Sequence, residues 1–171
     1  MEAGVRRFPV TRQATKYSFL IPAFLLFLWV YPLYLVPTAI LGERSYSEMV
    51  LIHSAILVLQ VSVFFTLLWA VSKRLGKAEE FWPVVTMINC SSIAGFVLMV
   101  PLFAMVMTGH HSWEEVFNAL LLVSFYELAL TSYIITRGMK VPWQFGTGLA
   151  FLGMFVYHAA SATVFTLIGV Q

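Results

Sequence analysis

Five long apolar runs constrain this chain more than any other feature of its sequence. They cover about residues 18–41, 49–72, 82–108, 115–136 and 143–169. Crossing the hydrocarbon core of a membrane takes a helix of about 20 apolar residues, and each run is long enough. Because lipid offers no water, the backbone N–H and C=O groups of a spanning segment must bond to one another. The runs therefore predict an all-α fold, a polytopic transmembrane bundle of five helices.

The composition agrees with this class of protein. The chain is 60% apolar and only 11% charged, whereas soluble domains carry about a quarter charged residues. It contains no Asp, and its single cysteine, Cys90, rules out an internal disulfide. A net charge of +2 is too small to indicate a nucleic-acid partner.

The runs also set the domain organisation. Residues 1–17 form a basic juxtamembrane segment, and residues 18–171 form one five-helix transmembrane domain. The connections, such as "GERSYSE" and "GHHSWEE", are too short to hold a soluble domain.

The basic residues predict the orientation of the bundle. Nine of the ten Lys and Arg residues fall before the first run or in the second and fourth connections, and only Arg44 falls on the other side. Cytoplasmic segments are enriched in Lys and Arg. We therefore expect a cytoplasmic N-terminus and a C-terminus on the outer side. The short connections favour a multi-pass protein of a bacterial inner membrane.

A few polar residues lie deep inside the apolar runs. Glu127 has no charged residue within nine positions on either side, and Gln60 and His158 also lie near the middle of their runs. We expect these three side chains to meet near the midplane. Other polar residues extend the same faces. The predicted intramembrane polar cluster comprises Glu127, His158, Gln60, Ser124, Thr131, Ser161 and Asn89.

An ionised Glu127 facing lipid would cost about 3 kcal/mol or more. We expect it to turn inward and contact His158, because antiparallel neighbouring helices bring the two to similar depth. One interpretation is interhelical hydrogen bonding that fixes the register of the bundle. The other is a proton or ion relay, or a contact for a polar substrate.

Small residues predict where the helices touch. They let helix backbones approach closely, particularly at four-residue spacing. The predicted packing residues are Ser91, Gly95, Gly146, Ala150, Gly153 and Ala160.

Proline and glycine predict irregular points. The segment "YPLYLVP" (31–37), with Pro32 and Pro37, is the expected place for a break in the first helix. Gly76 and Gly138 suit left-handed C-terminal caps.

Other chemistry finds little support in the sequence. His53 and His158 differ in depth by about 10 Å of helical rise, which is too far for axial ligands of one haem iron. His110 and His111 are adjacent histidines in a polar loop, and such pairs are more often plain loop residues than metal ligands. No paired carboxylates, catalytic Ser/His/Asp order or phosphate-binding glycine motif is present. We expect no enzymatic activity, no cofactor and no resident metal.

The layout resembles the Yip1-type membrane proteins, a family of five-span bundles. The likeness lies in five closely spaced runs over residues 18–169, joined by "SKRLGKAEEFWP" (72–83) and by the short hairpin within "YIITRGMKVPWQFGTGLAF" (133–151). Eukaryotic members have a long soluble N-terminal region used in GTPase trafficking, which residues 1–17 do not match. We therefore transfer no trafficking role and no functional residue.

These observations favour a non-enzymatic accessory or stabilising subunit of a larger membrane assembly. Its expected partners are membrane lipids and other membrane-protein subunits, in a hetero- or homo-oligomer, with no nucleic acid. The alternative is a small transporter or proton-conducting protein built on Glu127 and His158. A membrane haem protein is a second alternative.

Overall fold

The computed structural model describes residues 12–36 and 44–169. Within them the chain forms α2 (Arg12–Ser18), α3 (Leu20–Leu35), α4 (Tyr46–Arg74), the 3₁₀ turn η1 (Ala78–Glu80), α5 (Phe81–Met107), α6 (Trp113–Gly138) and α7 (Trp143–Leu167). Among these residues, five helical segments are long and apolar enough to cross a membrane. The predicted all-α five-helix fold is confirmed, and its orientation in the membrane stays a prediction.

The first spanning segment differs most from its prediction. It runs over Gln13–Leu35 instead of residues 18–41, and α2 and α3 meet at a break at Phe19. Pro22 explains the break, because a proline ring clashes with the carbonyl four residues earlier. That carbonyl belongs to Ser18, the last residue of α2. Helix α3 then ends at Leu35, inside the predicted segment 31–37, and Pro37 lies outside the described residues.

Two helices begin with a capping box. The Ser45 backbone N–H donates to Glu48 Oε2 at the start of α4, and the Ser112 N–H donates to Glu115 Oε2 at the start of α6, both at 2.8 Å. In each case the serine hydroxyl accepts from the third helical N–H. Four N–H groups at a helix start lack intrahelical partners. The capping boxes therefore satisfy donors where the chain enters the membrane.

One end of the bundle is basic. This basic end carries Lys73, Arg74, Lys77, Arg137 and Lys140. Gly76 adopts a left-handed conformation there (φ 67°), as predicted. Gly138 does not: it stays in α6, where a side chain would overlap Val84. Lys140 takes the left-handed position instead, with φ 52°.

The loops at the basic end are tied together. The Lys77 ammonium donates to the carbonyl of Lys140 at 2.6 Å, and Lys140 pairs with Glu80. These contacts join the α4–α5 connection to the α6–α7 connection.

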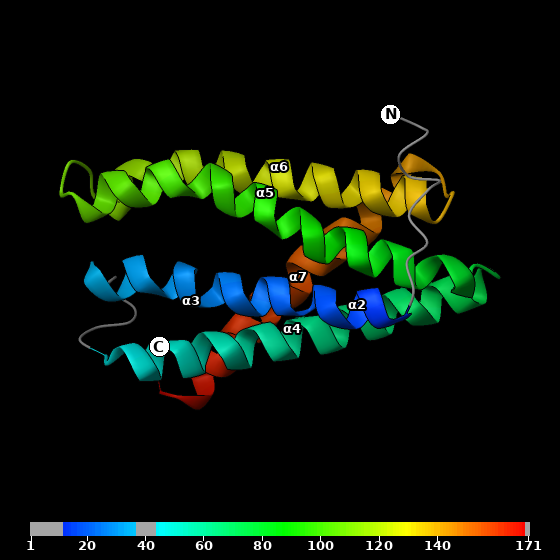
Figure 1. Ribbon diagram of the computed structural model, residues 1–171, viewed down its shortest axis with the longest axis horizontal. Coiled ribbons are helices and arrows are strands. Elements are labelled where there is room, and N and C mark those ends of the chain that lie inside the picture. Colours follow the sequence, from blue (N-terminus) through cyan, green and yellow to red (C-terminus); the bar gives the residue numbers. More distant parts are fainter. Residues whose placement is uncertain (1–11, 37–43, 170–171) are drawn as a thin grey trace.

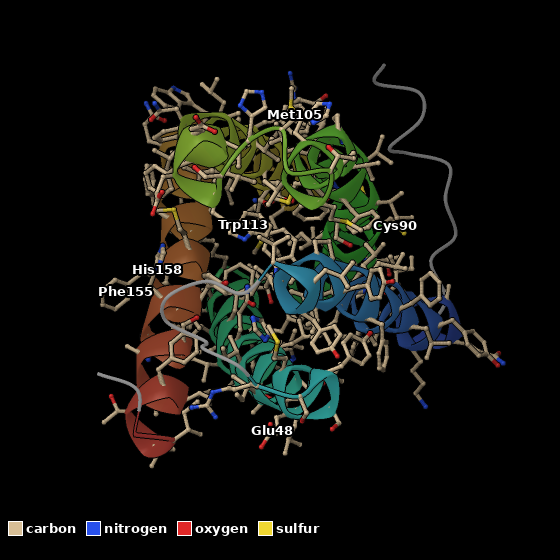
Figure 2. All side chains as sticks on the ribbon, turned by 90° about the vertical axis from the view of Figure 1, so that its left-hand side faces the viewer. Glu48, Cys90, Met105, Trp113, Phe155 and His158 are labelled. Carbon is tan, nitrogen blue, oxygen red and sulfur yellow. The ribbon has the colours of Figure 1, made fainter. Side chains whose placement is uncertain are left out.

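The spanning helices form a ring rather than a flat layer. In Figure 1, α5 and α6 lie side by side, α2–α3 and α4 run below them, and α7 crosses obliquely behind. The contacts follow the order α3, α4, α7, α6, α5 and back to α3. The end-on view in Figure 2 shows Trp113 inside this ring.

The interior is filled by two kinds of packing. Toward the basic end, Phe64, Val85, Ile135 and Met139 belong to the largest buried cluster. Toward the other end, aromatic rings fill the space. Trp29 meets Phe103 edge-to-face at 5.0 Å between centroids, and the Trp113 indole N–H donates to the carbonyl of Val36 at 2.7 Å.

The outer surface of the bundle is largely apolar and exposed. Only 17–33% of the most apolar part of each spanning segment is buried within the protein. Leu51, Leu122 and Phe155 are about 70% exposed (71%, 70% and 69%). Contiguous apolar surface of this extent is rare on soluble monomers. The chain is accordingly a multi-pass integral membrane protein.

The α6–α7 contact provides a direct test of this packing. A Cβ at Gly146 would overlap Thr136 Oγ1 and lie 3.0 Å from the carbonyl oxygen of Ser132, whereas Gly148 faces open space. We expect Gly146→Ala to lower the free energy of unfolding by about 1–3 kcal/mol through overpacking. Gly148→Ala should cause no loss, because alanine is the better helix former. Thermal unfolding in one mild detergent compares the two, and equal stability of both variants would contradict this packing.

Candidate functional site

Glu127 packs against α5. Its side chain lies on the backbone of Gly95: a Cβ built there would overlap Glu127 Oε1 and lie 2.9 Å from Glu127 Cγ. Glu127 itself is half-buried. The glycine therefore provides the space that the carboxyl group occupies, and it directs this group toward α5.

Helical periodicity accounts for the direction of Glu127. Val123, Glu127, Leu130 and Ile134 recur at intervals of four, three and four residues, which places them on one face of α6. Val123 and Ile134 are buried in the bundle. Glu127 thus belongs to the row of α6 that faces its neighbours.

The predicted row Ser124–Glu127–Thr131 is only partly inside. Thr131 is half-buried and Ser124 is exposed. The Ser124 hydroxyl donates to the carbonyl of Leu120 at 3.1 Å, so its own helix satisfies it. Ser124 therefore does not join the interior around Glu127.

His158 lies on the outside of the bundle. It is exposed, and Figure 2 shows it with Phe155 on the outer side of α7. Within the part of the chain that the structure describes, no hydrogen bond or ion pair joins Glu127 to His158. The expected contact between Glu127 and His158 is therefore not made.

The phase of α7 explains this outcome. Its buried residues include Gly153, Val156 and Ala160. His158 comes two residues after Val156, which is a rotation of about 200° around a helix with 3.6 residues per turn. The depth of the two side chains was suitable for a contact, but the direction of His158 was not.

Gln60 lies on α4 and Ser161 on α7, two helices that pack against each other. Gln60 is half-buried and lies one turn from both Ile56 and Phe64, which are buried residues of α4. Ser161 is half-buried, and its hydroxyl oxygen is enclosed without a hydrogen-bond partner among the described residues. Neither side chain is hydrogen-bonded to Glu127.

Asn89 belongs to a separate polar cluster between α2 and α5. It is buried, and its amide donates to the Ser18 hydroxyl at 2.9 Å. The Ser18 hydroxyl donates to the carbonyl of Thr15 at 2.7 Å, and the Thr86 hydroxyl donates to the Thr15 hydroxyl at 2.9 Å. This network fixes the first helical segment on α5 beside the break at Phe19.

Sequence reasoning missed Thr15, Ser18 and Thr86. Thr15 fell in the predicted juxtamembrane segment, although it is fully buried. A usable signal was present: Thr15 and Ser18 are three residues apart, as are Thr86 and Asn89. Such matching pairs present polar groups on one face of each helix.

The predicted packing residues occupy several different contacts. A Cβ at Gly153 would lie 2.9 Å from the Phe64 ring of α4. Ala160 packs with Ile52 and Ile56 of α4, and Ala150 is buried. Ser91 is half-buried, and its hydroxyl donates to Ile88 of the same helix at 2.8 Å.

His53 and His111 make local contacts within their own segments. The His53 Nδ1–H donates to the carbonyl of Met49 at 2.9 Å. His111 lies 3.4 Å from Glu115 Oε2, the oxygen that caps α6. Over residues 12–36 and 44–169, no three or more His, Cys, Asp and Glu side chains are close enough to hold a metal ion.

No protein-family model, curated protein or solved structure matches this chain. The resemblance to Yip1-type proteins stays a prediction, and the five apolar helices are the part of that layout that the structure shows.

The fit between Gly95 and Glu127 can be tested by a double-mutant cycle. We expect Gly95→Ala to destabilise the protein by about 1–3 kcal/mol, because the new methyl group displaces the carboxyl group. In a Glu127→Ala background the same change should cost much less, since the nearest obstructing atoms are gone. Unfolding in one detergent gives the coupling energy. Equal costs in both backgrounds would show that Glu127 does not lie on Gly95.

Proposed function

We propose that this protein is a non-enzymatic accessory subunit that stabilises a larger membrane assembly in a bacterial inner membrane. The outer face of α7 around His158 is its contact with the partner. The observation that carries this proposal is a histidine that points out of the bundle halfway along a spanning helix.

The depth of His158 makes lipid an unsuitable neighbour. It lies fifteen residues after Trp143, the start of the 25-residue helix α7. Polar side chains at such depth usually face protein or a water-filled cavity, because hydrocarbon cannot hydrogen-bond to them. A partner that covers this face and hydrogen-bonds to the imidazole removes that cost.

The residues around His158 suit a transmembrane helix. Ala159, Ala162 and Thr163 are exposed and small, so a second backbone can approach closely. Phe155, one turn before Ala159, offers a large apolar side chain beside them. The partner chemistry is therefore a spanning helix with small residues and a hydrogen-bonding group opposite His158.

The rival proposal, a proton-conducting protein or transporter, relies on Glu127. Its side chain has a packing role on Gly95, and the relay needs a second group that exchanges protons with it. Proteoliposome flux that disappears in Glu127→Gln, with normal folding, would favour the rival over an accessory role.

A matched pair of substitutions tests the partner face. We expect His158→Leu to abolish co-purification of the partner in mild detergent without lowering the unfolding temperature. Ser124→Leu should retain the partner, because Ser124 is also exposed in mid-span but is satisfied by its own helix. Quantitative mass spectrometry of the purified complexes measures the effect.

Crosslinking supplies the control for location. A photoreactive residue at Phe155 should capture the partner that His158→Leu loses, whereas one at Leu122 on α6, equally exposed, should not. A protein that purifies as a monomer with no such adduct would overturn the proposal.

A further inference from the structure

A groove runs along the outer face of the α6–α7 pair at the basic end. It has a volume of about 640 Å³, within the ~300–1,000 Å³ usual for ligand pockets. Its wall follows one side of α6 from Phe125 through Ala129, Ser132 and Tyr133 to Arg137, and Trp143 of α7 closes the basic end. We propose that this groove binds one membrane phospholipid, with the phosphate at Arg137 and Trp143 and an acyl chain along α6.

The length of the groove matches one leaflet. Phe125 and Arg137 are twelve residues apart in a continuous helix. At 1.5 Å per residue they are separated by about 18 Å. Half of a ~30 Å hydrocarbon core is about 15 Å. A lipid whose phosphate lies at Arg137 would place its chain along the groove toward the bilayer centre.

Arg137 is available for an anion. Its guanidinium lies 5.8 Å from the centroid of the Tyr133 ring, at the side of the groove. Among the described residues no carboxylate pairs with it, whereas Lys140 nearby in sequence is paired with Glu80. Guanidinium groups bind phosphate with two parallel hydrogen bonds. The exposed Trp143 indole adds an amphipathic ring of the kind that lies at the headgroup level.

The middle of the groove suits a hydrocarbon chain. The hydroxyls of Ser132 and Thr147 lie 2.7 Å apart and hydrogen-bond to each other. Thr136 Oγ1 is enclosed against Gly146. The hydroxyls of Ser132, Thr136 and Thr147 are therefore turned to the helix contact, and Phe125, Leu128 and Ala129 offer apolar surface to the chain.

Lys73 provides a matched control for the charge. It lies in the last turn of α4, as Arg137 does in α6, and its ammonium lies 5.2 Å from the centroid of the Trp69 ring. The groove does not include Lys73. The two residues thus share their position in the last turn of a helix, their positive charge and an aromatic neighbour. Only Arg137 lines the groove.

Native mass spectrometry with added phosphatidylglycerol tests the site. The unmodified protein should retain one phosphatidylglycerol molecule, and Arg137→Gln should weaken its binding about fivefold. Ala129→Phe, which fills the groove and keeps the charge, should weaken it as well. Lys73→Gln should leave it unchanged. Thermal unfolding of each variant verifies that the fold is retained.

Three results would overturn the proposal. Equal weakening by Arg137→Gln and Lys73→Gln would mean general attraction to the basic end. Full binding by Ala129→Phe would mean that no chain lies in the groove. Phosphatidylglycerol binding that is unaffected by Arg137→Gln would place the lipid elsewhere. The co-purifying partner of the α7 face is measured separately, so failure of the lipid site leaves that experiment unaffected.

Discussion

Satisfaction of backbone hydrogen bonds in a medium without water is the constraint on which the structure depends. This constraint makes every spanning segment helical. Backbone N–H and C=O groups then lack intrahelical partners only where a helix starts, ends or breaks. Several such points in the described chain have local polar contacts. The starts of α4 and α6 have capping boxes, and the basic end joins its two connections through Lys77 and Lys140. The break before Pro22 lies beside the Ser18–Asn89 hydrogen bond.

Polar side chains follow the same rule inside the bundle. Hydroxyl groups pair across helix contacts, as in Ser132–Thr147 and Thr86–Thr15, or donate to a carbonyl of their own helix, as in Ser91. The enclosed hydroxyls of Thr136 and Ser161 are exceptions, without a hydrogen-bond partner among the described residues. Glu127 fits over a glycine instead. These contacts join neighbouring helices of the bundle. His158 departs from the rule because it points outward, and this is why the outer face of α7 carries the proposed partner contact.

The two outward surfaces singled out above differ in chemistry. The face around His158 combines small residues with one hydrogen-bonding ring in mid-span, which suits a helix. The groove at the basic end combines the exposed guanidinium of Arg137 with an apolar wall that continues along α6, which suits a phospholipid. A partner and a lipid could be bound at the same time, because the first surface lies on the half of α7 away from the basic end and the second lies along the α6 side of the α6–α7 contact.

The sequence alone determined the class of fold, the number of spanning helices and their bounds to within four residues for the last four. Length and hydropathy suffice for this, because lipid imposes one solution on any long apolar run. It also indicated that Gly76 would be left-handed and that the first helix would end within residues 31–37. The depth of each residue in the bilayer could also be predicted, because it needs only a count of residues from the end of the apolar run. What the tertiary structure decided was direction: that Glu127 meets Gly95, that Asn89 meets Ser18, and that His158 faces away. The rotation of each helix about its axis depends on how all five pack together, and five weakly amphipathic helices leave that choice to side-chain fit.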